Sequence, residues 1–218
     1  MPTAVTLAAA YAGLMRDPTY RIRLTQYVCQ CLPEQGALSI LDIGAGDGSM
    51  IRAIADARPG TSAFGVETYL RGTMRQGRVP LIAYDGFNLP FADASVDVVL
   101  LVNVVHHAAD QRRLIDSACR VARRRVVIKD HLQESTLDWA RLAFLDIAGN
   151  LRFGASATGT YRSRAEWNAL LGSRAGWTLE IFDDLEFREG WLARAFPNAL
   201  EVLMVLECRD AVARSPGT

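Results

Sequence analysis

The sequence predicts an α/β fold in which helices cover both faces of one mostly parallel sheet. From about residue 38, short runs rich in isoleucine, valine and leucine alternate with amphipathic stretches. The runs are apolar throughout, which is typical of strands that are buried on both faces. With 218 residues, half of them hydrophobic, the chain is long enough for one well-filled domain and short for two.

Residues 1–36 carry two helical patterns, broken near Asp17-Pro18, where proline suits a first helical turn better than a helix interior. We therefore expect a helical N-terminal cover in front of the sheet. The main domain should occupy residues 37–212, and residues 213–218 should form a flexible tail.

Seven apolar runs are expected to form strands. They cover residues 38–43, 62–66, 81–84, 96–102, 126–129, 177–182 and 200–207. Helices are expected between them at residues 49–57, in a short segment after Thr68, at 110–122 and at 136–148, where Gly149 should stop the last one. The last two strands leave no room for a helix but have a loop with Gly190, Pro197 and Asn198, so we expect them to pair antiparallel.

The charge balance disfavours some classes of partner. Acidic and basic residues number 24 each, so no overall positive field attracts nucleic acid or an anionic membrane. The basic residues are nearly all arginine, with Lys129 as the only lysine. The four cysteines lack the spacing of a zinc site or a disulfide framework, and no segment reaches the ~18 apolar residues of a membrane span. We expect a soluble, cytoplasmic protein with a small-molecule partner.

A glycine-rich turn, Gly44-Ala45-Gly46-Asp47-Gly48, follows the first expected strand and precedes a helix. Glycines permit tight backbone angles there and let a ligand approach the backbone closely. A dinucleotide-binding fingerprint needs G-x-G-x-x-G, but Ser49 occupies the position of its third glycine. A P-loop is excluded because G-K-[ST] is absent. From these residues alone, a purely structural turn remains an alternative.

The stretch from Leu41 to Gly48, with an acidic residue before G-x-G-x-G, resembles the first motif of class I S-adenosylmethionine (SAM) dependent methyltransferases. The resemblance continues in order over about residues 38–130 and is closest to the enzymes that act on small molecules. It implies a Rossmann-like doubly wound sheet with an antiparallel last strand, and SAM as the cofactor. The residues it assigns to the cofactor in this turn are Asp42, Gly44, Ala45, Gly46 and Gly48.

Further cofactor residues are implied at the ends of the next strands. Glu67 stands where the family places the carboxylate that binds both ribose hydroxyls, and Thr68 follows it. A nicotinamide dehydrogenase would place an acid there too, so Glu67 does not discriminate between the two classes. The segment 85–99, with its Leu-Pro-Phe, resembles the family's third and fourth blocks. The resemblance then implies contacts to adenine from Asp85, Gly86 and Phe87, and a contact to the methionine end from Asn103.

Candidate catalytic residues follow the fourth and fifth strands. Methyl transfer from a sulfonium is an in-line displacement, so the enzyme aligns the acceptor and removes its proton where needed. We expect His107 to be the general base, because an imidazole titrates near working pH, with Asp130 and His131 as the other candidates. His106 should line the substrate site. For each histidine, a structural role as a cap or a packed ring is an equal alternative.

Asp130-His131 permits a metal-dependent interpretation, in which Asn103, Asp130 and His131 bind an ion. The resembling catechol-type enzymes have an acid where Asn103 stands and an amide where His131 stands. We therefore expect no metal.

The acceptor should bind under the segment 151–164, which is long enough to form a lid. Tyr161 and Trp167 are candidates to line this pocket, although core packing explains either equally well. The expected function is methyl transfer from SAM to a small organic acceptor, with oxygen as the favoured atom and carbon and nitrogen as open alternatives. The alternatives are a nucleotide-dependent oxidoreductase and a SAM-binding protein without turnover.

Overall fold

The computed structural model describes residues 18–34, 36–68, 79–150, 159–172, 174–182 and 184–211. The expected short helix after Thr68, most of the first helical pattern, the tail from residue 213 and residues 151–158 of the expected lid lie outside this part of the chain.

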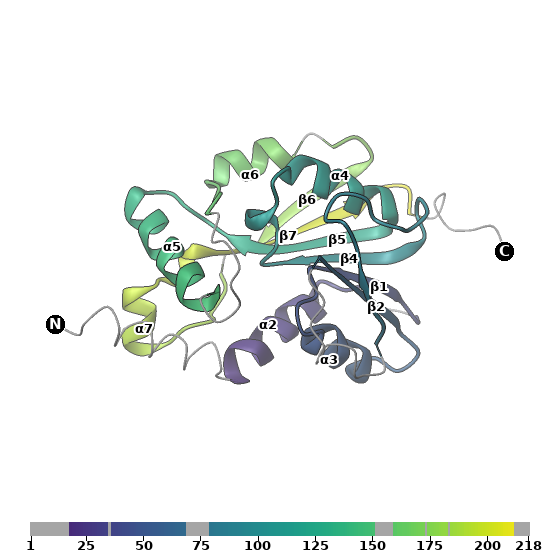
Figure 1. Cartoon of the computed structure of the whole chain (residues 1–218), viewed down its shortest axis with the longest axis horizontal. Coiled ribbons are helices and arrows are strands. Elements are labelled where there is room, and N and C mark those ends of the chain that lie inside the picture. Colours follow the sequence, from purple (N-terminus) through teal and green to yellow (C-terminus); the bar gives the residue numbers. More distant parts are fainter. Residues whose placement is uncertain are drawn as a thin grey trace.

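The seven expected strands form one sheet in the order β3-β2-β1-β4-β5-β7-β6 (Figure 1). They are β1 (Ser39–Ile43), β2 (Ser62–Glu67), β3 (Leu81–Ala83), β4 (Val96–Val102), β5 (Ala122–His131), β6 (Trp177–Phe182) and β7 (Glu201–Cys208). Strands β1 to β5 run parallel, and β7 runs antiparallel to both of its neighbours. The predicted doubly wound fold with an antiparallel last strand is confirmed.

Helices pack on both faces of the sheet. Helices α2 (Pro18–Gln30) and α3 (Ser49–Ala57) cover one face, where Val28 and Ile54 join Ile40 and Leu100 in one buried cluster. Helices α4 (Gln111–Val121) and α6 (Arg164–Leu171) cover the other face (Figure 1). Burying both faces explains why the strands are apolar throughout.

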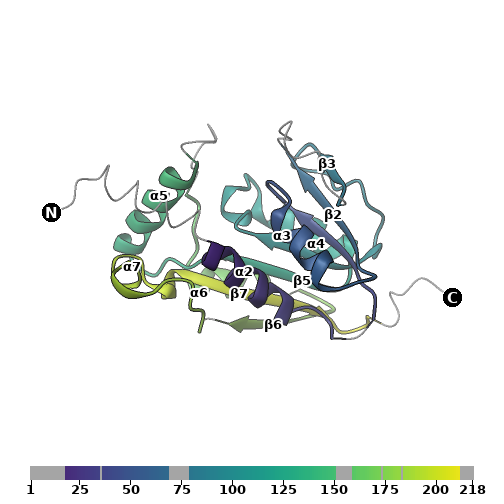
Figure 2. The same cartoon turned by 90° about the horizontal axis from the view of Figure 1, so that it is seen from below.

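A third, smaller cluster lies beyond the end of the sheet. Helices α5 (Thr136–Asn150) and α7 (Gly190–Ala195) project there side by side in both views (Figures 1 and 2). Their neighbourhood buries Leu142, Leu145, Tyr161, Phe196 and Leu200. The segment that carries α5 starts directly after β5, so the cluster is tied to the edge where the parallel strands end.

The structure corrects four expectations about the elements. Strand β5 starts at Ala122 instead of residue 126, because Ala122 pairs with Val96 of β4. Helix α5 runs through Gly149 to Asn150, so this glycine does not stop it. Helix α7 lies between β6 and β7, where we expected a loop without a helix. Helix α6 was not expected.

The missed helix α6 had a signal in the sequence. Ser163 accepts a hydrogen bond from the backbone of Glu166, whose side chain in turn accepts one from the backbone of Ser163. This reciprocal pair is a capping box, whose S-x-x-E pattern is visible without a structure.

None of the described helices is long and apolar enough to cross a membrane.

The sheet order places a ligand-binding edge at the ends of β1 and β4. Strand β1 lies between β2 and β4, and Ile43 at its end is paired with Leu101. The connections after these two strands leave in opposite directions, which opens a crevice outside the carboxyl ends. The segments that follow β1, β2, β4 and β5 are therefore the ones that build the site.

Candidate functional site

The glycine turn after β1 needs its glycines for two different reasons. Gly44, Gly46 and Gly48 all have positive φ angles, of 72°, 56° and 70°, which favour glycine. A Cβ atom on Gly44 would also lie 2.6 Å from Cγ2 of Val104, so the turn packs closely against the segment after β4. A Cβ on Gly46 would meet nothing within 4 Å. The backbone at Gly46 is therefore open to a ligand, while Gly44 brings two strand ends together.

Glu67, at the end of β2, lies against this turn. Its Oε2 accepts a hydrogen bond from the backbone N–H of Gly46 at 3.0 Å, and its Oε1 accepts one from the N–H of Thr68 at 2.8 Å. The carboxylate is half-buried and remains accessible. A carboxylate held beside an open glycine turn fits the ribose of the expected cofactor, which offers two neighbouring hydroxyl donors.

Asp42 lies beneath the turn. Its side chain is 2% exposed, and its pKa is raised to about 8 by burial and by the charge of Glu67. The sequence led us to expect that Asp42 contacts the ligand directly. Its burial suits it better to support the turn from below.

Asp85 shapes the turn after β3. Its Oδ1 accepts hydrogen bonds from the N–H groups of Phe87 and Asn88 at 2.8 and 2.7 Å, and these bonds lower its pKa. Gly86 has a φ of 82°, and a Cβ there would approach Thr68 at 3.2 Å, so this turn lies next to the end of β2. The ring of Phe87 is 51% exposed. The guanidinium of Arg113 lies over this ring, 5.4 Å from its centroid. An exposed aromatic ring in a turn next to the end of β2 fits a base attached to the ribose.

Asn103 ends β4 in a left-handed conformation, with a φ of 53°. Its N–H donates to the carbonyl of Lys129, and its side-chain Oδ1 accepts from Nζ of Lys129 at 2.6 Å. The side chain is thus fixed by the lone lysine, at the strand end where the methionine part of the cofactor is expected.

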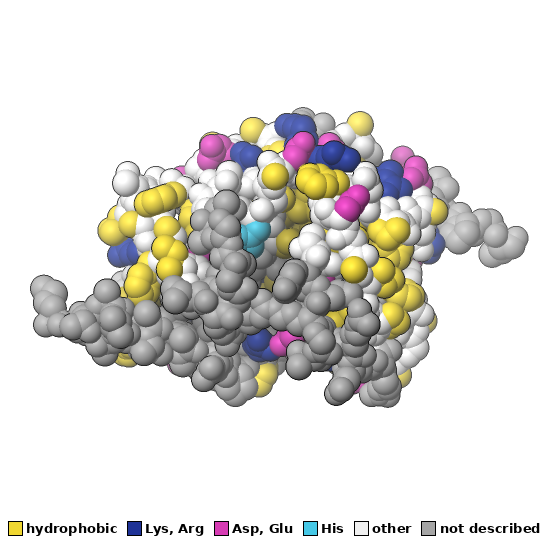
Figure 3. Space-filling view, in the orientation of Figure 1, with side chains coloured by type: hydrophobic (Ala, Val, Ile, Leu, Met, Phe, Trp, Pro, Cys, Tyr) yellow, Lys and Arg dark blue, Asp and Glu magenta, His cyan; other side chains and the backbone are white. Residues whose placement is uncertain are grey.

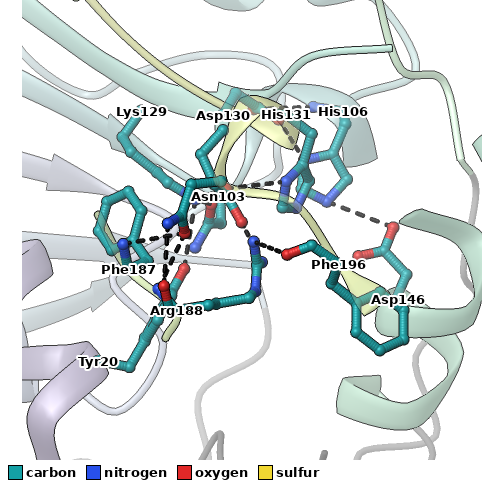
Figure 4. A network of polar contacts seen from close by, with 12 residues as sticks. Tyr20, Asn103, His106, Lys129, Asp130, His131, Asp146, Phe187, Arg188 and Phe196 are labelled. Atoms are coloured by element: carbon teal, nitrogen blue, oxygen red, sulfur yellow. Dashed lines mark hydrogen bonds and ion pairs between the residues drawn. The ribbon is translucent and has the colours of Figure 1, made fainter. Parts of the chain in front are cut away.

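A fully buried ion cluster underlies this strand end, and the sequence analysis did not find it (Figure 4). Nζ of Lys129 lies 2.5 Å from Oε2 of Glu201 on β7, and Arg188 pairs with the other carboxylate oxygen. Lys129 and Glu201 are 0% exposed. The sequence did contain a signal for this cluster, which was a single lysine inside an apolar strand. A charged group is buried only when it has partners, so such a lysine indicates buried acidic side chains nearby.

Asp130 holds the histidine-bearing turn η2 (Val105–His107) in place. Its Oδ2 accepts from the backbone N–H groups of Val105 and His106 at 3.1 and 3.3 Å. Its Oδ1 lies 2.6 Å from Nδ1 of His106 and also accepts from the N–H of His131 at 2.7 Å. Burial would raise the pKa of Asp130, but the charge and hydrogen bond of His106 outweigh it and hold that pKa well below its ordinary value. With four donors around it, Asp130 is poorly suited to take a proton from an acceptor.

All three histidines of the chain gather around η2. The ring centroid of His106 lies 4.0 Å from that of His107 and 4.9 Å from that of His131. On the far side, Nε2 of His106 lies 3.6 Å from Oδ2 of Asp146 on α5 (Figure 4). The hydroxyl of Tyr161 donates to the same carboxylate. We call His106, His107, Asp146 and Tyr161 the histidine cluster.

The pKa values of the two adjacent histidines are shifted in opposite directions. Burial would lower the pKa of His106, but Asp130 and Asp146 outweigh it and raise that pKa to about 10. Burial, and then the charge of His106, lower the pKa of His107. His107 is half-buried, whereas His106 and His131 are buried.

An open cleft of about 640 Å³ borders the cluster at His107. Its walls come from the start of α4, from α6 and from the segment before α6, and its lining includes Asp110, Gln111, Thr160, Arg162 and Glu166. The space-filling view shows one histidine reaching the surface at the centre of this face (Figure 3). This cleft is separate from the glycine turn, but Val104 contacts Gly44 and lies three residues before His107. The cleft is therefore a candidate site for a ligand near the glycine turn.

The three expected substrate-binding residues, His106, Tyr161 and Trp167, are buried, and none of them lines the cleft. Trp167 is 2% exposed in the main core, and its Nε1 donates to the carbonyl of His131 at 3.0 Å. This placement corrects the expected pocket role of Trp167, because a ring enclosed by core side chains has no surface for an acceptor. Tyr161 is also buried, with its hydroxyl on Asp146.

The three residues that the sequence suggested as metal ligands have other polar partners in the structure. Asn103 is bound to Lys129, Asp130 accepts four hydrogen bonds, and Nδ1 of His131 lies 3.2 Å from Oε2 of Glu201. Ligand atoms of Asp130 and His131 nevertheless lie within 4.8 Å of one another and of one on His106.

Comparison with protein families places the central part of the chain. Residues 41–128 match the family described as methyltransferase domain. An uncharacterized methyltransferase of Mycobacterium sp. strain JLS is 34% identical over 119 residues, which is 53% of this chain and 46% of that protein. One from Mycolicibacterium vanbaalenii is 37% identical over 95 residues, or 41% of this chain and 36% of that protein. The chain thus spans less than half the length of these relatives.

Solved structures share the fold over almost the whole chain. A SAM-dependent methyltransferase from Aquifex aeolicus aligns with a TM-score of 0.60 and 13% identity, covering 91% of this chain and 97% of that one. The plantazolicin methyltransferase BpumL, solved with a desmethyl plantazolicin analogue and S-adenosylhomocysteine (SAH), aligns with a TM-score of 0.63 and 15% identity, covering 92% and 89%. At such identities the likeness concerns the fold.

Proposed function

We propose that this chain, which carries a class I SAM-dependent methyltransferase domain, transfers a methyl group from SAM to a small organic acceptor, with oxygen as the receiving atom. The observation that carries the proposal is the open glycine turn at Gly46, with Glu67 held against it, at the switch point of a sheet ordered as in these enzymes. The methyltransferase match over residues 41–128 supports this assignment against the nucleotide-dependent oxidoreductase.

In this proposal SAM supplies a methyl group on a sulfonium: the acceptor oxygen bonds to the methyl carbon, the carbon–sulfur bond breaks with its electron pair left on sulfur, and the acceptor loses a proton. Glu67 accepts hydrogen bonds from the ribose hydroxyls, and the open backbone at Gly46 lets the ligand approach the turn closely. Asn103, fixed by Lys129, borders the methionine end. The turn after β3, with Gly86 and Phe87, borders adenine.

The acceptor occupies the cleft beside His107 in this proposal. His107 is the member of the histidine cluster that lines the cleft, and Val104 ties the same segment to the glycine turn. The acceptor's reacting group therefore lies between the cluster and the methyl group. A cleft of about 640 Å³ is in the range of small-molecule sites. The neutral overall charge of the chain also favours a small acceptor over nucleic acid.

Two measurements test the proposal. Isothermal titration calorimetry should show binding of SAM and SAH and no binding of NAD. Incubation with SAM labelled in the methyl group and pools of small phenols and alcohols should release SAH and transfer the label. Binding without any SAH formation would support a SAM-binding protein without turnover, and NAD binding without SAM binding would overturn the proposal.

A substitution at Glu67 tests the cofactor site itself. Glu67→Ala should weaken SAM binding by about 1.5–3 kcal/mol, or roughly 10- to 150-fold, because charge-assisted hydrogen bonds to ribose are lost. Glu67→Gln, which keeps the shape and one acceptor, should lose less. Circular dichroism should show both variants folded, and an unchanged SAM affinity in Glu67→Ala would show that Glu67 does not bind ribose.

A further inference from the structure

His106 is held in the way that a metal-binding histidine is held. Its Nδ1 lies 2.6 Å from the buried carboxylate of Asp130, while its Nε2 is buried and has no hydrogen-bond partner among the described residues. A carboxylate on one ring nitrogen orients the ring and directs the other nitrogen toward an ion. Because the pKa of His106 is raised to about 10, an ion binds at Nε2 by displacing the proton held there. The side chain that Nε2 faces is Asp146, at 3.6 Å.

Two more donors surround the same point. Ligand atoms of His106, His107 and Asp146 all lie within 4.8 Å of one another. A tetrahedral zinc ion with nitrogen and oxygen ligands at ~2.0–2.1 Å needs its ligand atoms roughly 3.3–3.5 Å apart, so small side-chain movements close the site. Asp146 is itself oriented by the hydroxyl of Tyr161, as Asp130 orients His106.

We propose that His106, His107 and Asp146 form a binding site for one divalent transition-metal ion of the zinc class. Two imidazoles and a carboxylate are donors that suit zinc and its first-row neighbours, whereas magnesium and calcium favour oxygen-only sets. The carboxylates of Asp130 and Asp146 flank His106 on both sides, so the negative charge that compensates a bound cation is already buried there.

The proposed site differs from the metal site that the sequence analysis considered and did not expect. That site would use Asn103, Asp130 and His131, which follow neighbouring strands. The proposed set takes Asp146 from α5 instead, about 40 residues after the paired histidines, and uses Asp130 only to orient His106.

The inference rests on the proposed function and specifies how the acceptor is activated. Three protein ligands leave a coordination position for a further group, as in catalytic zinc sites. The site meets the cleft through His107, which belongs to both. An ion there lowers the pKa of a hydroxyl bound to it, which eases loss of the acceptor's proton. His107 then acts as a metal ligand in place of the general base expected from the sequence.

The experiment measures metal content and coordination separately from turnover. The full chain is treated with EDTA, dialysed, titrated with Zn²⁺ by calorimetry, and analysed for bound zinc by mass spectrometry. Loading with Co²⁺ provides a second readout, because tetrahedral cobalt absorbs visible light with an intensity that reports its ligands. We expect one zinc ion per chain and a cobalt spectrum of four-coordinate type.

Variants identify the ligands. Asp146→Asn and His106→Asn should each weaken zinc binding by more than the roughly 10- to 100-fold typical of losing an orienting residue. Asp138→Asn, on the same helix α5, is the control and should bind zinc as the wild type does. Because Asp138 accepts hydrogen bonds from Glu134 and Ser135 at the start of α5, circular dichroism must show that this variant keeps its helix content. Circular dichroism identifies variants that fold, and His107→Asn is a further ligand variant if one of the others does not.

The outcomes separate this inference from the proposed function. Folded wild-type chain that binds no zinc, or zinc binding unchanged in Asp146→Asn and His107→Asn, overturns the metal site. If SAM then still binds and SAH still forms, the proposed function stands without it. Zinc binding at one ion per chain without any SAM binding would support the site and overturn the proposed function.

Discussion

Replacing Glu201 with glutamine should destabilise the fold strongly, because it leaves two buried cations without their shared anion. Glu201 is fully buried on β7, with Nζ of Lys129 at 2.5 Å on one carboxylate oxygen and Arg188 on the other. The amide of glutamine has almost the same size but no charge. The variant therefore isolates the electrostatic part of the interaction from packing.

The expected magnitude follows from burial. Removing one partner from a buried ion pair costs about 3–5 kcal/mol, because the remaining charge stays in a medium of low dielectric constant. For a chain of this length, each kcal/mol lowers the melting temperature by roughly 2–4 °C, so the loss should be about 6–20 °C. The matched control is Glu207→Gln on the same strand. Its carboxylate is half exposed and pairs with Arg125, so it should cost only ~0–1 kcal/mol.

Urea unfolding of wild type and both variants, followed by circular dichroism between pH 7 and pH 3, measures these differences. Burial would raise the pKa of Glu201, but Lys129 and Arg188 outweigh it and hold the pKa well below its ordinary value of 4.5. A carboxylate with a lowered pKa contributes its full stability above its unfolded pKa and loses that stability as the pH falls. The gap between wild type and Glu201→Gln should therefore be largest near pH 7 and shrink below about pH 4.5. A gap under 1 kcal/mol at pH 7, or one that grows toward pH 3, would refute this reasoning.

Two further substitutions test the packing around the site. Gly44→Ala should destabilise the chain by more than the roughly 1–2 kcal/mol of a positive φ angle and should also weaken SAM binding, because its Cβ would lie 2.6 Å from Cγ2 of Val104. Gly36→Ala has the same kind of backbone angle but open space around its Cβ, so similar losses in both variants would contradict the close contact. Trp167→Phe should lower stability by about 1–3 kcal/mol, because the carbonyl of His131 loses its donor, with the KM for the acceptor unchanged. A large rise in that KM would restore Trp167 to the acceptor pocket.

The sequence determined the sheet and its functional edge because both depend on local patterns. Apolar runs of four to eight residues located all seven strands, and Val96–Val102 and Trp177–Phe182 were predicted with their observed bounds. The glycine turn and Glu67 were identifiable because a tight turn requires particular residue types close together in the chain. Their order along the chain was enough to indicate the cofactor class.

Local patterns were insufficient where a neighbour in space sets the outcome. Strand β5 extends back through its arginines because Ala122 and Arg125 pair with β4, and β7 also pairs with Arg125. Residues 122–125 carry no local pattern that predicts these partners. Helix α7 forms in a stretch that reads as a loop, with Phe196 beside it packed into the third cluster. Trp167 has the chemistry of a pocket residue, and only its position under β5 places it in the core.

By itself the sequence determined the fold class, the position of the glycine turn and the paired histidines. Only the tertiary structure decided what those histidines face. Asp146 lies on a helix about 40 residues away and Glu201 on a strand about 70 residues beyond Lys129, and both reach the end of β5 because the sheet and α5 bring them there. A buried charge is stabilised by whichever opposite charge folding places within a few ångströms, and separation along the chain carries no information about that distance.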